Sequence, residues 1–212
     1  MFSLGTGVLV TVCWVGGIAI LGLGAWLVCY APNCTVTNLD ATLLDWFAQR
    51  RNETFDSFFR AVTWLGSIAV LVPAVVAGMS LLAFRRRIRE GLFLGLALGG
   101  TFVIVHVSKL VAARPRPADI NAVIAMPWDL SFPSAHSAQI VAVVLASLIV
   151  ISRLDRGWLK WLVPIGVLCV FLVALSRIYL QVHYPSDVLA GTLAAGLWVF
   201  GLAKLMFLRG SK

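Results

Sequence analysis

The sequence predicts an all-α integral membrane protein, a bundle of six transmembrane helices formed by a single domain over residues 1–212. Apolar residues make up 60% of the chain and charged residues only 12%, a composition typical of a membrane domain and not of a soluble globule. The apolar residues gather in runs long enough to cross a hydrocarbon core of about 30 Å. Most of the charges fall in the short segments between these runs.

The first predicted span covers residues 7–28, and about 20 apolar residues suffice to cross the membrane as a helix. A cleaved signal peptide would begin with a charged segment and end at a small-residue cleavage site. This run has neither feature. A membrane-spanning helix is therefore the favoured interpretation.

Residues 31–60 form the one long polar connection before the remaining spans. Its apolar residues at helical spacing are Leu43, Leu44, Trp46, Phe47, Phe55, Phe58 and Phe59. Two interpretations stay open, an amphipathic helix lying at the outer interface and a loop helix packed on the bundle. Cys29 and Cys34 flank Pro32 at the mouth of the first span. They are either a disulfide, in an oxidising compartment, or two free thiols.

Five further spans are predicted over residues 61–84, 91–112, 137–152, 161–178 and 187–207. Six spans put both termini on one side of the membrane. The basic residues of that side are Arg85, Arg86, Arg87, Arg89, Arg153, Arg156, Lys160, Arg209 and Lys212. By the positive-inside rule this side is cytoplasmic, in a cell inner (plasma) membrane. The net charge of +8 is then explained by topology and contact with anionic lipids, and no nucleic-acid partner is expected.

The chemistry falls in two connections that open on the same side. Because successive spans alternate in direction, the connection after span three (residues 113–136) and the connection after span five (residues 179–186) both face away from the basic side. Their polar groups can therefore meet. The charge rule places this meeting point on the extracytoplasmic face.

The first of these connections carries cations and a histidine. Lys109 is a compact cation, and Arg116 presents a planar fork of donors that binds phosphate oxygens bidentately; taken alone, both are also explained by snorkelling to lipid head groups. Ser134, Ala135 and His136 begin the fourth span. A hydroxyl and free backbone N–H groups at a helix N-terminus make an anion site, although alone they indicate no more than a helix cap.

The second connection supplies a third cation, an imidazole and a carboxylate. Arg177 ends the fifth span, and His183 and Asp187 are four residues apart, with Pro185 suited to the first turn of the sixth span. This turn can bring Asp187 back to the His183 ring. A carboxylate that keeps one ring nitrogen protonated leaves the other free as a nucleophile. The rival interpretation of this segment alone is an interfacial salt bridge.

Together the segments resemble the three signature motifs of the type 2 phosphatidic acid phosphatase family. The motifs are K-x6-R-P from Lys109 to Pro117, P-S-A-H from Pro133 to His136, and S-R-x5-H-x3-D from Ser176 to Asp187. They keep the order and internal spacing of that family over spans three to six, about half of the chain. The family usually has glycine in place of Ala135, and glycine would tolerate a positive φ and a close phosphate approach.

The resemblance implies a phosphatase that needs no metal and no other cofactor. His183 would attack phosphorus, Asp187 would orient the ring, and His136 would protonate the leaving oxygen. The groups that would hold the phosphoryl oxygens are Lys109, Arg116, Ser134, Ala135 through its amide, and Arg177. Arg114 is expected to be auxiliary, and His106 is expected to be a packed helix residue.

The predicted function is hydrolysis, at the outer leaflet, of the terminal phosphate of a lipid mono- or diphosphate. The substrate classes to separate are undecaprenyl diphosphate, phosphatidylglycerophosphate and phosphatidic acid, and the expected partners are the substrate and the membrane lipids, with the oligomeric state open. Three alternatives remain: a non-catalytic phospholipid-binding or carrier protein, a phosphatase for a soluble sugar phosphate, and a vanadate-dependent haloperoxidase, whose known examples are soluble enzymes.

Overall fold

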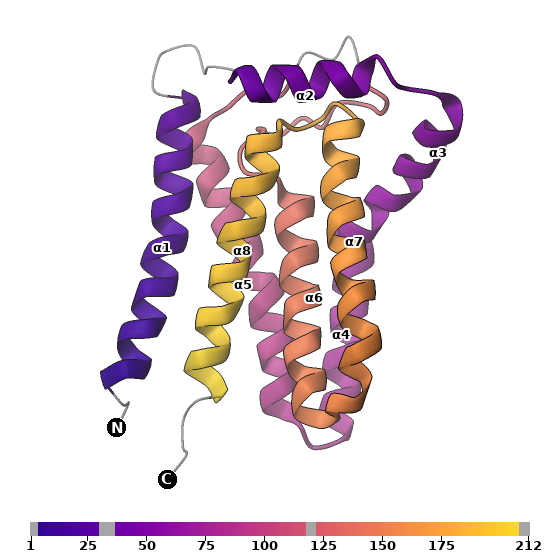
Figure 1. The fold of residues 1–212 in the computed structure, drawn as a ribbon. Coiled ribbons are helices and arrows are strands. Elements are labelled where there is room, and N and C mark those ends of the chain that lie inside the picture. Colours follow the sequence, from indigo (N-terminus) through magenta and orange to yellow (C-terminus); the bar gives the residue numbers. More distant parts are fainter. Residues whose placement is uncertain (1–3, 30–36, 118–121, 208–212) are drawn as a thin grey trace.

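The computed structural model describes residues 4–29, 37–117 and 122–207, and every regular element in these ranges is helical. The elements are α1 (Leu4–Cys29), α2 (Asn38–Ala48), α3 (Glu53–Val62), η1 (Thr63–Gly66), α4 (Ile68–Phe84), α5 (Ile88–Ala112), α6 (Ala135–Leu154), η3 (Arg156–Trp158), α7 (Leu159–Tyr179) and α8 (Pro185–Phe207). The predicted all-α class is confirmed. The long helices run side by side, and α2 lies across their upper end (Figure 1).

Five helices of the described residues are long and apolar enough to cross a membrane, and a sixth span results if one bent pair is counted. In the bent pair, α3 with η1 meets α4 at an angle of 42°. The span predicted over residues 61–84 therefore contains a bend within its first part. The chain breaks at Ser67, where the backbone is extended and the side chain accepts a hydrogen bond from the amide of Ala69, so that α4 starts afresh.

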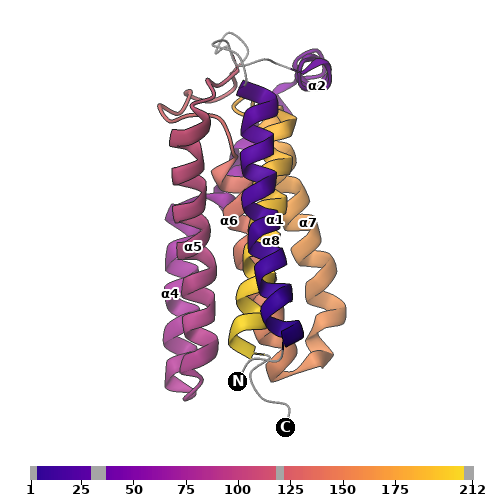
Figure 2. The ribbon, with the colours of Figure 1, turned by 90° about the vertical axis from the view of Figure 1, so that its left-hand side faces the viewer.

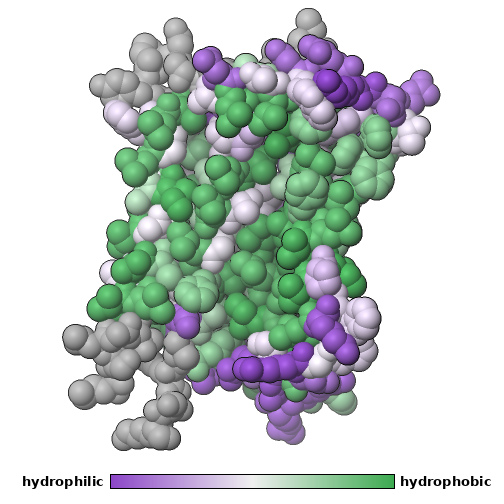
Figure 3. Space-filling model, in the orientation of Figure 1, coloured by the Kyte–Doolittle hydropathy of each residue, from purple (hydrophilic) through white to green (hydrophobic). Residues whose placement is uncertain are grey.

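The bundle is organised around α6, which packs against α4, α5, α7 and α8, while α1 packs mainly on α8. Figure 2 shows α1 in front of α8, with α4 and α5 paired at the side. The main apolar cluster contains residues from each of the helices α4, α5, α6, α7 and α8. Phe93, Val173 and Val199 are among its members, and each is 0% exposed. A hydrophobic belt separates two polar ends (Figure 3), as a bilayer requires.

The two ends of the bundle carry different segments. The connections after α5 and after α7 lie at the upper end with α2, whereas the α4–α5 and α6–α7 connections lie at the lower end (Figure 1). The N-terminal end of α1 and the C-terminal end of α8 are also at the lower end. The two segments that carry the motifs are thus neighbours in space.

Helix α2 forms part of the connection over residues 31–60, for which an interfacial helix and a helix packed on the bundle were both open. It is a helix packed on the bundle, with Asp40 and Leu44 buried against it and contacts to α7 and α8. Trp46 on the same helix is 47% exposed. The choice between a disulfide and two free thiols at Cys29 and Cys34 lies outside the described residues.

Candidate active site

The groups predicted from the motifs come together at the upper end of the bundle. Their positions are Lys109 in the last turn of α5, Arg116 in the following connection, His136 in the first turn of α6, Arg177 in the last turn of α7, His183 between α7 and α8, and Asp187 in the first turn of α8. Arg116, Arg177, Lys109 and His136 all act electrostatically on the His183 ring. The ends of the four helices α5, α6, α7 and α8, with the connections between them, therefore build one site.

His183 is 1% exposed and has its two ring nitrogens in different surroundings. Its Nδ1 lies 3.5 Å from Asp187 Oδ2 and 3.4 Å from Ser131 Oγ. Its Nε2 faces Arg116, whose terminal nitrogen is 3.1 Å away. Burial, with the charges of Arg116 and Arg177, holds the pKa of His183 well below its usual range. In a neutral ring with Nδ1–H toward the carboxylate, Nε2 carries the lone pair, which accepts from Arg116 here and is the nucleophilic position of the ring.

Asp187 is fixed by a buried network that reaches back to α2. Its Oδ1 accepts a hydrogen bond from Arg114 at 2.6 Å, and its Oδ2 accepts from Ser131 at 2.5 Å and from the Tyr184 amide at 3.0 Å. The other end of the Arg114 guanidinium pairs with Asp40 at 3.0 Å. Because Arg114, Asp40 and Asp187 are all at most 1% exposed, the arginine is compensated by two carboxylates where water does not reach it.

Arg114, which the sequence analysis expected to be auxiliary, holds the carboxylate that faces His183. A backbone feature explains how it gets there. Ala113 ends α5 in the left-handed region, with φ of 48°. This reversal turns the chain, and Arg114 enters the buried network while Arg116 reaches the histidine.

Lys109 and Arg116 form a cationic pair that is occupied by the carboxylate of Asp129. The distances to Asp129 are 3.1 Å from Lys109 Nζ and 2.5 Å from Arg116. The ammonium of Lys109 also donates to the Leu130 carbonyl. Although burial opposes ionisation, the Lys109 and Arg116 charges lower the pKa of Asp129 to about 2. The pair thus already binds an anionic oxygen ligand, as it would bind a phosphate.

The P-S-A-H segment starts α6 close to α8. Ser134 is the N-cap residue of α6, and its amide donates to the Asp187 carbonyl at 3.0 Å. Ala135 is the first helical residue and does not belong to the positive-φ residues of the described chain, so alanine fits the backbone in place of glycine. At Gly191 of α8 a Cβ would lie 2.8 Å from the Ser134 carbonyl oxygen. The glycine permits this close approach.

Arg177 is 2% exposed and is oriented by the neighbouring bend. One terminal nitrogen donates to Thr63 Oγ1 of η1 at 2.6 Å. Its Nε is buried and has no hydrogen-bond partner among the described residues. Such an orphaned donor is costly in a protein interior unless a ligand satisfies it. Arg177 also acts electrostatically on His136, which fits a shared role beside a phosphoryl group.

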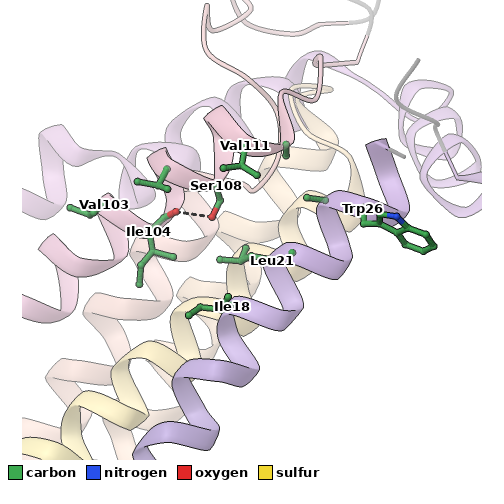
Figure 4. Close-up of a pocket in the computed structure, with 11 residues that line it drawn as sticks. Ile18, Leu21, Trp26, Val103, Ile104, Ser108 and Val111 are labelled. Atoms are coloured by element: carbon green, nitrogen blue, oxygen red, sulfur yellow. Dashed lines mark hydrogen bonds between the residues drawn. The ribbon is translucent and has the colours of Figure 1, made fainter. Parts of the chain in front are cut away.

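Two cavities in the described part of the chain lie near the upper half of the bundle and differ in chemistry. A cavity of about 390 Å³ has His136 and Arg177 in its wall together with Arg60, Thr63 and Trp64. A larger groove of about 640 Å³ lies between α1 and α5 (Figure 4) and is lined mostly by apolar side chains. Its Ser108 hydroxyl donates to the Ile104 carbonyl at 2.8 Å. The smaller cavity touches the predicted catalytic groups and the larger one does not.

Several contributors to the site escaped the sequence analysis. They are Asp40, Thr63, Asp129 and Ser131. For Asp129 and Ser131 a signal existed, because both lie within the four residues that precede P-S-A-H in the sequence. Asp40 gave no such signal, since its partner Arg114 is 74 residues away.

Two further predictions of the sequence concern His106 and metal binding. His106 stacks on Phe102 and its Nδ1 contacts the carbonyl oxygen of that residue at 2.8 Å, as expected for a packed helix histidine. Within the described ranges no three His, Cys, Asp or Glu side chains form a group that could hold a metal ion. The residues at hand are suited to binding an anion.

Comparison with known proteins places this site in a family. Residues 90–211 match the model of the PAP2 superfamily. Phosphatidylglycerophosphatase B of Bacillus subtilis is 32% identical over 158 residues, covering 73% of this chain and 76% of the relative. An undecaprenyl-diphosphatase of Sulfolobus acidocaldarius is 36% identical over 123 residues, and this match covers 56% of each protein. The chain thus spans little more than half the length of that relative.

The fold has a counterpart in a solved structure. The transmembrane PAP2-type phosphatidylglycerolphosphate phosphatase of Bacillus subtilis superposes with a TM-score of 0.78, covering 94% of this chain and 98% of that one at 23% identity. At this identity the likeness concerns the fold, and with the apolar helices it identifies a multi-pass membrane protein. The matched family region contains all three motifs from Lys109 to Asp187. The chain belongs to the PAP2 superfamily.

Proposed function

We propose that the protein is a lipid phosphate phosphatase that removes the terminal phosphate of a lipid mono- or diphosphate through a phosphohistidine at His183. The observation that carries this proposal is the surroundings of the His183 ring. Nδ1 faces the Asp187 carboxylate at 3.5 Å, while Nε2 faces the Arg116 guanidinium at 3.1 Å. A nucleophile oriented on one side and placed beside a phosphate-binding cation on the other is the arrangement that phosphoryl transfer needs.

In the proposed reaction Nε2 of His183 forms a bond to phosphorus while the bond from phosphorus to the leaving oxygen breaks. The electron pair of that bond stays on the leaving oxygen, which takes a proton from His136. Asp187 stabilises the positive charge that develops on the His183 ring. Water then attacks phosphorus, with His136 accepting its proton, and the N–P bond breaks to release inorganic phosphate.

The charge on the phosphoryl oxygens is held by cations and hydrogen-bond donors from the three motifs. They are Lys109, Arg116, Arg177, the Ser134 hydroxyl and the Ala135 amide. The orphaned Nε of Arg177 would gain a partner when a phosphate binds. Preorganised donors of this kind act most strongly in a site that excludes water, and Lys109 and Arg177 are 3% and 2% exposed.

The proposed substrates are lipids because the site opens at the end of a membrane bundle. Undecaprenyl diphosphate and phosphatidylglycerophosphate are the substrate classes that the names of similar proteins suggest, and phosphatidic acid is the third class considered. A head group at the interface can reach His136 through the cavity while its hydrocarbon tails stay in the bilayer. Trp64, 57% exposed beside that cavity, offers an apolar surface to such tails.

The proposed location is a cell inner (plasma) membrane with the site on the extracytoplasmic side. Support comes from the distribution of charge, since Arg85, Arg86 and Arg87 connect α4 to α5 at the end opposite the site. Arg153 and Arg156 lie at the same lower end, around the α6–α7 connection. By the positive-inside rule that end faces the cytoplasm.

The direct test is phosphate release by purified protein in the presence of EDTA. We expect release from a lipid phosphate to continue in the chelator and to be abolished in His183→Ala, because the nucleophile is lost. His136→Ala should still form phosphoenzyme, best with a substrate whose leaving group needs no proton. Labelled phosphate trapped on a residue other than His183 would contradict the mechanism, and a requirement for added metal would contradict metal-free chemistry.

A further inference from the structure

Arg60 lies at the mouth of the catalytic cavity and has no part in the mechanism above. It is in the last turn of α3 and lines the same cavity of about 390 Å³ as His136 and Arg177. Thr63 and Trp64 of η1 continue this wall. The bend between α3 and α4 thus brings a cation from an otherwise amphipathic helix to the catalytic groups.

The direction of the reaction decides which part of the substrate meets Arg60. In an in-line displacement the nucleophile and the leaving oxygen lie on opposite sides of phosphorus. His183 is 1% exposed and does not line this cavity, whereas His136, the proposed proton donor to the leaving oxygen, does. This reasoning rests on the proposed function. It places the leaving group in the cavity that Arg60 lines.

The charge of Arg60 is available to a ligand there. One terminal nitrogen donates to the backbone carbonyl of Val123 at 2.9 Å, a neutral acceptor that positions the guanidinium and leaves its charge in place. The nearby carboxylate of Asp56, one turn earlier, is already engaged by Arg51 at 3.0 Å and by the Tyr179 hydroxyl at 2.8 Å. Arg60 itself is exposed, so an incoming anion can reach it.

We propose that Arg60 binds a second phosphate on the leaving-group side of the substrate, and that the enzyme thereby prefers lipids with two phosphates over simple lipid monophosphates. When the P–O bond of a diphosphate breaks, its electron pair remains on a lipid monophosphate, whose negative charge grows. A guanidinium beside that group stabilises the charge. The phosphodiester of phosphatidylglycerophosphate lies one glycerol unit from the scissile phosphate and offers Arg60 a fixed negative charge to bind, whereas the alcohol that leaves from a simple monophosphate offers none.

The experiment compares substrates matched in their tails. Phosphate release is measured for farnesyl diphosphate against farnesyl phosphate, and for phosphatidylglycerophosphate against phosphatidic acid with the same acyl chains. In Arg60→Ala we expect kcat/KM to fall about tenfold for a substrate with a second phosphate and to change by less than about twofold for the monophosphates. Arg60→Lys keeps the charge and should lose less.

Arg50→Ala is the matched control, because Arg50 is another cation near the upper end that packs over Trp46 and does not line the cavity. It should leave all four rates in the same ratio as wild type. A selective loss on farnesyl diphosphate identifies the diphosphate as the ligand, and a selective loss on phosphatidylglycerophosphate identifies the phosphodiester. An equal loss on all four substrates, or none, overturns the role of Arg60 alone. A wild-type protein that releases no phosphate from any of them overturns the proposed function as well.

Discussion

Arg114 shows how much of the site depends on a residue that touches no substrate. Its guanidinium joins Asp187 at 2.6 Å to Asp40 at 3.0 Å and also donates to the Ser186 hydroxyl at 2.8 Å. The carboxylate that faces His183 is thereby fixed without exposure to water. Removing one partner of such a buried network leaves the others uncompensated.

We expect Arg114→Ala to destabilise the protein by about 3–5 kcal/mol, because two buried carboxylates lose their cation. In folded protein kcat should fall about a hundredfold with little change in KM, since a displaced Asp187 no longer orients His183. Thermal unfolding and steady-state kinetics in detergent measure the two effects. Asp40→Asn should have a smaller effect on kcat, because it leaves the Arg114–Asp187 contact in place. If kcat were equal in wild type and Arg114→Ala, Arg114 would have no role in orienting His183.

We expect Asp129 to compete with a phosphate ligand for Lys109 and Arg116, the cations with which it pairs. Asp129→Asn should therefore strengthen inhibition by vanadate, a phosphate analogue, by roughly fivefold to tenfold, since Lys109 and Arg116 are released for the ligand. With the pKa of Asp129 lowered to about 2, its carboxylate pairing is lost only as the pH falls through that value. The gain should thus be the same between about pH 5 and pH 8.

The control for this experiment is Asp45→Asn, which removes an exposed carboxylate of α2 at the same end of the molecule. It should leave the inhibition constant unchanged. Weaker vanadate binding in Asp129→Asn would show instead that the carboxylate orients Arg116, and the idea of competition would be abandoned.

The motifs predicted the charged residues of the site better than the contacts between them. The six-residue spacing from Lys109 selected Arg116, and the structure places Arg116 3.1 Å from His183. The same spacing set Arg114 aside, although it pairs with Asp187. The role of Arg114 depends on the left-handed backbone of Ala113 and on a partner in α2. Neither can be read from local sequence, because alanine rarely adopts that conformation.

At the level of helices, the approach of α8 to the start of α6 determines whether the catalytic segment keeps its shape. Gly191 provides the clearance, because a Cβ there would lie 2.8 Å from the carbonyl oxygen and 3.4 Å from the amide nitrogen of Ser134. Backbone atoms cannot move aside as a flexible side chain can. The close contact at Gly191 thus fixes the start of α6 relative to Asp187 in the first turn of α8.

Gly191→Ala is accordingly expected to lower stability by about 1–3 kcal/mol through overpacking and to reduce kcat, because Ser134 and His136 are displaced together. Gly196→Ala in the same helix is the control. A Cβ at that position would meet only Leu145 Cδ1, at 4.0 Å, and alanine is favoured over glycine in a helix. Unfolding and activity assays of the pair check this, and equal behaviour of the two variants would show that the contact is unimportant.

Hydropathy predicted where the chain is apolar, and it could not predict where a helix bends. The 61–84 run is apolar through the break at Ser67, so no change in composition marks it. The break follows from packing, because a Cβ at Gly66 would lie 2.7 Å from Val173 Cγ1 and 3.1 Å from His136 Cβ. The chain therefore turns where it meets α6 and α7, and the contact belongs to the tertiary structure.

For the whole molecule, the orientation in the membrane is the open question that a labelling experiment answers. Trp128 is 100% exposed in the connection beside the site, and Phe84 is 87% exposed at the opposite end. In a variant without native cysteines, Trp128→Cys should react with an impermeant thiol reagent in intact cells. Phe84→Cys should react only after lysis. The reverse pattern would place the site on the cytoplasmic side.

At this scale the sequence was most informative, because burial in lipid leaves a strong compositional signal. The all-α membrane bundle was predicted from apolar runs alone, and alternation of the spans predicted that the connections after α5 and α7 share one end, as they do (Figure 1). The packing of α2 over that end was one of two open interpretations, since amphipathic spacing alone does not distinguish a bilayer surface from a protein surface.

The break before α4 also affects the surrounding bilayer. The 17 residues of α4 extend about 26 Å, less than the roughly 30 Å of a typical hydrocarbon core, whereas the 26 residues of α1 extend about 39 Å. The rest of this span is the bent segment of α3 and η1, so we expect lipids beside the bend to adapt by local thinning. The cavity with His136 and Arg177 opens on that flank. We therefore expect a lipid phosphate there to sit deeper than the average head group and to need a smaller displacement from its own leaflet to reach the histidines.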